Sequence, residues 1–171
     1  MQSSIQVGVN GSIVWIQVAG RGSFLNSGGL KEFAREMVKR GYREFVFDLE
    51  ECVMMDSTFM GTMAGMALRL KEMGQGRVRV IHAGERSRDL LSGLGLDQIF
   101  DIQENGAAAP KCDALEQNDS ETSDRSTEAK RAQAGTMIEA HEALCQAAPD
   151  NRTRFKDVLD YLKQDLESPA K

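Results

Sequence analysis

The chain has few of the features that mark secreted, membrane-spanning or zinc-binding proteins. Its three cysteines, Cys52, Cys112 and Cys145, are odd in number and far apart, which fits neither a disulfide framework nor a paired-cysteine zinc site. We therefore interpret them as reduced and mostly buried thiols. No apolar run approaches the roughly 20 residues of a membrane helix, and Met1 to Ile5 lacks the pattern of a secretory signal. We expect no membrane insertion and a cytoplasmic location.

A basic excess is also missing. The chain has 21 Lys and Arg against 26 Asp and Glu, which gives a formal net charge of -5. Because nucleic-acid binders normally present a basic face, this balance argues against a nucleic-acid partner. With 41% hydrophobic and 27% charged residues, the composition is typical of a soluble globular protein. A length of 171 residues suits one domain with room for an appendage.

Residues 1–104 carry alternating strand and helix patterns. The ranges 5–9 and 12–18 are rich in β-branched residues and flank Asn10-Gly11, a dipeptide suited to a tight hairpin turn. We expect further strands at 44–49, 77–82 and 99–102, and helices that start at Asn26 or Ser27, at Ser57 and at Glu85. This order predicts a single small α/β domain with a mixed sheet opened by a β-hairpin and helices on the right-handed crossovers.

The remaining residues predict a helical appendage. Residues 105–126 are rich in Ala, Asp, Glu, Ser and Thr, and we expect a flexible acidic linker because so few apolar side chains cannot offset the entropy of ordering. Residues 127–171 carry two apolar stripes around a turn at Pro149-Asp150-Asn151, which predicts an amphipathic helical hairpin. The first stripe contains Met137, His141, Leu144 and Cys145, and the second contains Phe155, Val158, Leu159, Leu162 and Leu166. Such a hairpin must bury its stripes against something else, and it could serve as an oligomerisation or docking element.

The helix that starts at Ser57 has two contrasting faces. At its start the Ser57 hydroxyl can cap a free backbone amide, and the helix N-terminus would also tolerate a phosphate. We assign one face to the core: Phe59, Met63, Met66, Leu70 and Met73, with Met60 and Ala67 beside them. The opposite face is small and apolar: Ser57, Gly61, Ala64, Gly65 and Leu68.

Glycine inside a helix costs about 1 kcal/mol relative to alanine, so Gly61 and Gly65 indicate the close approach of another backbone. One candidate occupant of this small-residue face is a partner protein, with Ser57 at the end of the interface. The other is the C-terminal hairpin of the same chain. The sequence leaves both open.

Several short motifs together resemble the STAS domain family, whose bacterial members include anti-sigma factor antagonists. The motifs are Asp56-Ser57-Thr58 after a strand, Gly61 in the helix, Gly74 and Gly76 before the next strand, and Leu94-Gly95-Leu96 before Phe100. The resemblance covers about residues 5 to 103. Where the family usually has a small residue two positions after the serine, this chain has Phe59. Because Phe59 lies on the core stripe, we expect the fold to accommodate it.

The resemblance implies a regulatory protein, not an enzyme. It implies that Ser57 is phosphorylated by a partner that is both serine kinase and anti-sigma factor, and that a serine phosphatase reverses this. The unphosphorylated form would bind the anti-sigma factor and release sigma factor. The partner-binding residues would be Asp56, Ser57, Thr58, Gly61, Ala64, Gly65 and Leu68. The alternative is a STAS-type scaffold or small-ligand-binding module in a signalling assembly that does not act on a sigma factor.

Signals for catalysis or metal binding are weak. Gly20-Arg21-Gly22 followed by Gly28-Gly29 lacks the spacing of a dinucleotide-binding loop. His82 falls in an expected strand and fits a packed or edge residue better than a general base. Asp48, Glu50, Glu51 and Asp56 gather near one strand end and could suggest a metal site, although solvated carboxylates are the simpler interpretation. We predict no catalytic residue, no metal and no cofactor.

Overall fold

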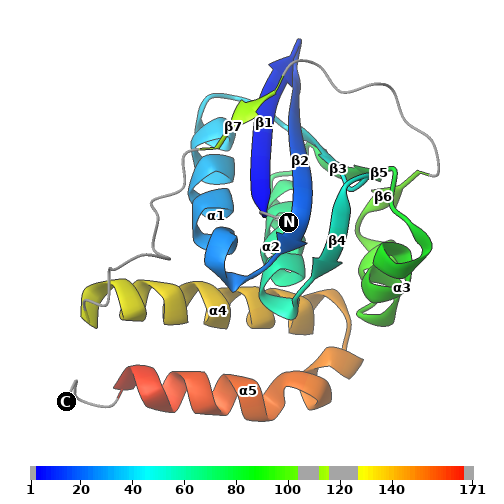
Figure 1. Ribbon diagram of the computed structural model, residues 1–171. Coiled ribbons are helices and arrows are strands. Elements are labelled where there is room, and N and C mark those ends of the chain that lie inside the picture. Colours follow the sequence, from blue (N-terminus) through cyan, green and yellow to red (C-terminus); the bar gives the residue numbers. More distant parts are fainter. Residues whose placement is uncertain (1–2, 104–111, 116–126, 168–171) are drawn as a thin grey trace.

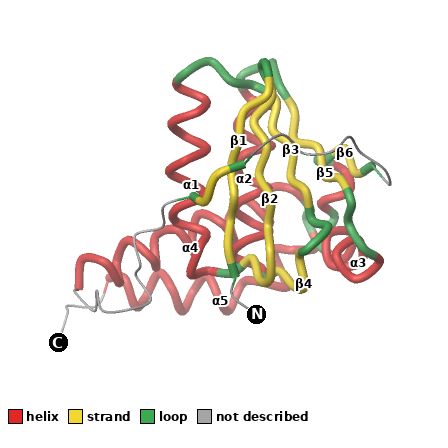
Figure 2. Tube along the Cα trace, turned by 45° about the horizontal axis from the view of Figure 1, so that its top comes forward, coloured by secondary structure: helices red, strands yellow, loops and turns green. Residues whose placement is uncertain are grey.

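The computed structural model describes residues 3–103, 112–115 and 127–167, and these residues form a layered α/β fold (Figure 1). Within them the strands form one mixed sheet in the order β6-β5-β3-β2-β1-β7, with β4 paired to β2. Helices α1 and α2 lie on one face of the sheet, and the α4–α5 hairpin runs across them on the side away from the sheet (Figures 1 and 2). The α/β class, the mixed sheet and the C-terminal helical region are confirmed.

The chain opens with the expected β-hairpin. β1 (Ser4–Asn10) and β2 (Ile13–Gly22) pair antiparallel, and Gly11 at the turn has a φ of 64°, a conformation that favours glycine. α1 (Phe24–Lys39) follows, but its cap is Ser23, so the expected start at Asn26 or Ser27 is wrong. Asn26 instead accepts a hydrogen bond from the Ser23 amide, which makes it the reciprocal half of a capping box.

The remaining elements follow the expected order with two additional strands. After β3 (Glu44–Asp48), the unexpected β4 (Cys52–Met55) pairs in parallel with the end of β2, which extends beyond β3. The elements that follow are α2 (Ser57–Glu72), β5 (Arg77–Ile81), α3 (Glu85–Gly93), the 3-10 helix η1 (Leu96–Gln98), β6 (Asp101–Ile102), β7 (Asp113–Ala114), α4 (Thr127–Ala147) and α5 (Asp150–Glu167). The last parallel strand is shorter than the expected 99–102, because residues 99 and 100 form the turn that follows η1.

β7 lies inside the range 105–126 that the sequence predicts to be a linker. It pairs antiparallel with β1, with Gln6 opposite Ala114, and the Leu115 amide donates to the Ile5 carbonyl at 2.9 Å. Asp113 and Ala114 form a strand despite their low β propensity, because the edge of β1 offers them unpaired backbone groups. Residues 105–111 and 116–126 lie outside the described residues, so flexibility of the linker stays a prediction there.

The main core lies between the sheet and the helices, and the C-terminal hairpin contributes to it. The expected α2 core stripe is confirmed for Phe59, Met63 and Leu70, whereas Met73, just after the end of α2, is 42% exposed. Ala143 and Leu144 of α4 and Phe155 of α5 belong to this same core. Of the described helices, none combines the length and the apolar character needed to cross a membrane.

Candidate functional site

The N-terminus of α2 is fixed by Asp56. The Asp56 carboxylate accepts from the Phe59 amide at 2.8 Å and from the Phe24 amide at 2.8 Å, so one side chain holds the starts of α1 and α2 together. Asp56 is therefore the N-cap, and the expectation that the Ser57 hydroxyl caps the helix is wrong. Because a carboxylate accepts more strongly than a hydroxyl, Asp56 takes the capping role, and Ser57 becomes the first helical residue with its hydroxyl available for another contact.

That contact is with His141 of α4. Ser57 Oγ lies 2.9 Å from His141 Nε2, and His141 Nδ1 lies 2.7 Å from the Met137 carbonyl oxygen. A carbonyl only accepts, so Nδ1 carries the proton, and in the neutral ring Nε2 then accepts from the Ser57 hydroxyl. His141 is 2% exposed, and its ring packs edge-on against Phe155 with centroids 5.0 Å apart.

The small-residue face of α2 is occupied by α4. A Cβ added at Gly61 would collide with the backbone carbonyl of Ala140, and one added at Gly65 would lie 3.8 Å from the Ala143 Cβ. Gly61 is therefore required by the close approach of α4, as the sequence predicts for this face. Of the two occupants that the sequence leaves open, the hairpin of the same chain is the one that lies there.

Further polar contacts hold the hairpin in place. Asp150 and Asn151, which the sequence places in the hairpin turn, are the first residues of α5. The buried Asn151 donates to the carbonyls of Leu94 at 2.9 Å and Leu144 at 2.8 Å, which ties the start of α5 to the end of α3. Arg154 adds a bond to the Gly93 carbonyl at 2.7 Å. Lys31 of α1 pairs with Glu139 of α4 at 2.7 Å, but Glu139 is 56% exposed and such pairs contribute about 0–1 kcal/mol.

The residues expected to bind a partner are therefore together but largely covered. Thr58 is 3% exposed, and Gly61 and Ala64 are also buried. Gly65, Leu68, Ser57 and Asp56 are half-buried. The signal that sequence reasoning left unused was His141, a polar residue on an otherwise apolar helical stripe. Its partner, 84 residues earlier in the chain, cannot be identified from local spacing.

Apolar side chains remain exposed next to the Ser57 end of α2. Phe24 and Leu25 at the start of α1 are each 40% exposed, and Val53 and Met54 of β4 are 52% and 37% exposed. Since the Phe24 amide donates to Asp56, these side chains border the start of α2. The hairpin thus contacts Ser57 through His141, while exposed apolar side chains remain near the start of α2.

Phe59, the departure from the family pattern, is fully buried in the main core. Gly22 makes room for it, because a Cβ at position 22 would lie 2.5 Å from the Phe59 ring. The fold thus accommodates the large side chain by a glycine on the facing strand. The expectation that Phe59 is compatible with the fold holds in this structure.

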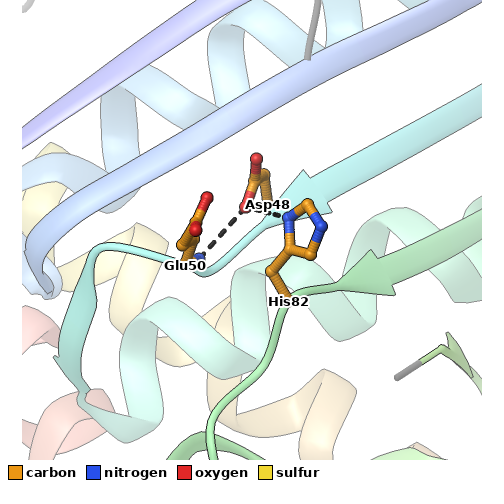
Figure 3. Close-up of side chains that lie close together, drawn as sticks. All are labelled: Asp48, Glu50 and His82. Atoms are coloured by element: carbon orange, nitrogen blue, oxygen red, sulfur yellow. Dashed lines mark hydrogen bonds and ion pairs between the residues drawn. The ribbon is translucent and has the colours of Figure 1, made fainter. Parts of the chain in front are cut away.

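The four acidic residues expected near one strand end do not form a single group. Asp48, Glu50 and His82 lie together with potential ligand atoms within 4.8 Å of one another (Figure 3), whereas Asp56 caps α2 and Glu51 is exposed. Asp48 is buried, and one of its oxygens accepts from His82 Nδ1 and from the Glu50 amide, both at 3.1 Å. The group offers one nitrogen and two carboxylates, a set compatible with a divalent cation, and Asp48 Oδ1 already accepts two hydrogen bonds within the group.

Cys52, Cys112 and Cys145 are free thiols and are half-buried, slightly more accessible than the sequence suggests. Burial raises the pKa of each of them above its ordinary value. A raised thiol pKa lowers the fraction of reactive thiolate at neutral pH. Burial outweighs the nearby positive charges of Arg152 and Lys163 at Cys145, so none of the three thiols has the lowered pKa of a catalytic cysteine.

A small cavity lies where α4 crosses α1 and α2. Its volume is about 150 Å³, and its lining includes Lys31, Arg35, Met66, Arg69, Thr136 and Glu139. Binding sites for drug-sized ligands usually occupy about 300–1,000 Å³, so this cavity could hold only a benzene-sized group. Neither Ser57 nor His141 lines it.

Comparison with known proteins gives a consistent family assignment. The sequence pattern of the STAS domain matches residues 4–109, and no curated protein sequence matches. The fold resembles Thermotoga maritima TM1081, described as a candidate anti-sigma factor antagonist, at 18% identity and a TM-score of 0.55, over 59% of this chain and 86% of that one. It also resembles the anti-sigma factor antagonist SpoIIAA in its unphosphorylated form, at 14% identity and a TM-score of 0.52, over 60% and 90% of the two chains. The phosphorylated form of SpoIIAA from Bacillus is similar at 16% identity and a TM-score of 0.50, over 59% of this chain and 92% of that one. The family match ends before α4, so the hairpin is additional to it.

Proposed function

The chain belongs to the STAS domain family, and from that premise we propose that it is a phosphorylation-switched regulator that binds an anti-sigma factor. In this proposal the unphosphorylated chain binds an anti-sigma factor that is also a serine kinase, and sigma factor is released for transcription. The kinase transfers phosphate to Ser57, which ends the interaction, and a serine phosphatase restores it. The proposal places this partner switching in the cytoplasm.

The position of Ser57 is the observation that carries the proposal. Ser57 is the first residue of α2 and its hydroxyl is not used for capping, because Asp56 does that. A phosphate on Ser57 would lie in the positive field of the helix N-terminus. SpoIIAA, which has the same fold, exists in both an unphosphorylated and a phosphorylated form, and this precedent supports the same modification here.

The phosphate would act mainly at the partner interface. It adds a charge of about -1.5 to -2 beside Asp56, and a partner would have to desolvate both groups. One close like-charge contact near a protein surface opposes binding by up to ~4 kcal/mol, which corresponds to about a thousandfold in affinity. A loss of this size is large enough for the partner to bind the unphosphorylated chain and not the phosphorylated one.

A catalytic use of Ser57 has less support. The Ser57–His141 pair has the distance of a nucleophile and its base, but a hydrolase also needs a substrate cavity beside the pair. The cavity between α1, α2 and α4 is lined by other residues. We therefore propose that the pair is a regulatory contact and not a catalytic dyad.

Affinity capture from the native cell with two baits tests the proposal. Ser57→Ala keeps the uncharged form, whereas Ser57→Asp places a negative charge at the same position. We expect Ser57→Ala to retain a protein with a serine-kinase ATP-binding domain and Ser57→Asp to lose it. If both baits retain the same proteins, or if the retained partner is a nucleotide- or lipid-linked assembly without a kinase, the proposal is wrong and the scaffold or ligand-module alternative takes its place.

A further inference from the structure

The α4–α5 hairpin lies on the surface that the proposed function assigns to a partner. α4 covers Gly61 and Gly65 and contacts Ser57 through His141. The family match over residues 4–109 does not include this hairpin. A segment outside the family pattern thus occupies the proposed interaction surface.

We propose that the small-residue face of α2 is a helix-docking surface with two mutually exclusive occupants: the α4–α5 hairpin when Ser57 is unmodified and unbound, and a helix of the partner when the hairpin is displaced. Phosphate on Ser57 prevents the hairpin from returning. This inference rests on the proposed function in taking Ser57 as the phosphorylated residue. The side chains that the partner helix needs can be inferred from those of α4, which occupies the same surface.

The surface accepts only a helix that presents small side chains. Ala140 and Ala143 are the α4 residues that face Gly61 and Gly65, and they are 3% and 9% exposed. Because the Ala140 carbonyl lies where a Cβ of residue 61 would be, the two backbones are in direct contact. A competing helix must therefore also carry small residues three positions apart, as α4 does.

A phosphate does not fit between Ser57 and the docked His141. The 2.9 Å separation of Ser57 Oγ and His141 Nε2 leaves room for a hydrogen bond only. The phosphoryl group removes the hydroxyl proton that Nε2 accepts and adds oxygens that are also acceptors, so His141 would need a second proton on Nε2 before it could donate to the phosphate. It would also place charge next to a side chain that is 2% exposed, where an unpaired charge is strongly unfavourable.

α4 cannot make room by a small shift. To make room, α4 would have to move away from α2, and Asn151 at the start of α5 opposes this movement through two buried hydrogen bonds. The other charged group at the start of α2 is Asp56, which would repel a phosphate and is already used for capping. Detachment of the hairpin avoids these costs and leaves the phosphate in the positive field of the helix N-terminus.

Two consequences follow by linkage. A partner or kinase reaches Ser57 only in the fraction of molecules with the hairpin displaced, so docking lowers the apparent affinity by that fraction. Reciprocally, phosphate on Ser57 weakens hairpin docking by the same factor by which docking disfavours the phosphorylated form at equilibrium. The hairpin therefore sets a threshold for the switch, and the phosphorylated chain stays open until the phosphate is removed.

Disulfide trapping between α2 and α4 tests this inference without any partner. Gly65→Cys and Ala143→Cys would bring two Cβ atoms about 3.8 Å apart, the usual separation in a relaxed disulfide. The full chain would carry this pair with Cys52, Cys112 and Cys145 replaced by Ser. Position 57 would be Ser, Ala or phosphoserine installed by genetic-code expansion, and oxidised glutathione would drive the bond.

We expect the Ser57 and Ser57→Ala chains to form the bond rapidly and the phosphoserine chain to form it at least about tenfold more slowly. Treatment with a non-specific phosphatase should restore the fast rate. Equal rates for Ser57 and phosphoserine chains would overturn the inference, because they would show that the hairpin stays docked over the phosphate.

Amide hydrogen exchange gives a second measurement on the chain with its native cysteines. Exchange within residues 136–147 of α4 should be at least about tenfold faster with phosphoserine at position 57. Unchanged protection there would equally overturn the inference. Neither measurement needs a kinase or an anti-sigma factor, so a failure of the proposed partner leaves both results interpretable.

Discussion

At the scale of single residues, Ser57 and His141 form the contact that connects the family domain to the hairpin. The hydroxyl donates to a buried imidazole whose other nitrogen is fixed by the Met137 carbonyl. Removal of the hydroxyl would leave a buried acceptor without a partner. Such a loss usually costs more than the net value of the hydrogen bond.

We expect Ser57→Ala to lower the free energy of unfolding by about 1–2 kcal/mol. Urea denaturation measures this, and the matched control is Ser92→Ala, an exposed serine of α3 whose replacement should stay within about 0.5 kcal/mol. The double variant Ser57→Ala with His141→Ala should be less destabilised than the sum of the two single variants, because the partners share one contact. Equal effects of Ser57→Ala and Ser92→Ala would show that the contact contributes nothing.

The cysteines provide a second test at this scale. Because burial raises the pKa of all three thiols, the folded chain should react with iodoacetamide at pH 7.5 more slowly than the urea-unfolded chain. The unfolded thiols ionise above about pH 8.5, while the folded ones still hold their protons. The unfolded state then binds fewer protons, so stability should fall as pH rises above that value.

The variant with all three cysteines replaced by Ser isolates this contribution. It should lose less stability between pH 8 and pH 10 than the native chain does. Identical pH profiles for the two chains, or equally fast alkylation of folded and unfolded protein, would contradict the assignment of raised thiol pKa values.

At the scale of secondary-structure elements, the contact between α2 and α4 explains the glycines of α2. Gly61→Ala should lower the free energy of unfolding by about 1–3 kcal/mol, because its Cβ forces α4 away. Gly28→Ala in α1 is the matched control, since a Cβ at that position meets nothing within 4 Å. It should raise the stability by up to ~1 kcal/mol, as alanine is the better helix former. If both substitutions stabilise the chain, α4 does not pack on α2 as described.

The sequence predicted the elements better than the contacts between them. Hydrophobic periodicity and turn residues identify the β-hairpin, α1 to α3 and both C-terminal helices, because these signals are local. β4 and β7 were missed, since each is a short segment that pairs only because a strand edge is available. Tertiary geometry decides whether Asp56 or Ser57 caps α2. It also decides that His141 is the hydrogen-bond partner of Ser57. The small-residue face itself was predicted, but not which of its two occupants would cover it.

At the scale of the whole molecule, the hairpin and the α/β layer share one core. Leu144 and Phe155 are buried with the residues of α2 and the sheet, and burial of each side chain contributes about 1.5–3 kcal/mol. Together they account for roughly 3–6 kcal/mol, against a total stability of about 5–15 kcal/mol for a typical domain. These two side chains alone therefore give the hairpin a substantial share of the stability of the chain.

Truncation after Asn105 tests this balance. The shortened chain keeps β1 to β6 and α1 to α3, so we expect it to fold and to melt cooperatively, but at a lower temperature than the full chain. Calorimetry and the binding of an apolar dye should report the uncovered face of α2. A truncated chain that is insoluble or melts without a cooperative transition would show that the hairpin is required for folding and is not a displaceable cover.

The most direct test of the central claim, that Ser57 is the switch, is to locate phosphate on the protein isolated from its native cell. Intact-mass measurement and peptide mapping should find a single phosphate, placed on Ser57, and none on the Ser57→Ala chain expressed in the same cells. A phosphate that persists on Ser57→Ala, with Thr58 as the first position to inspect, or a chain that remains unphosphorylated under every growth condition while its partner kinase is present, would contradict the account.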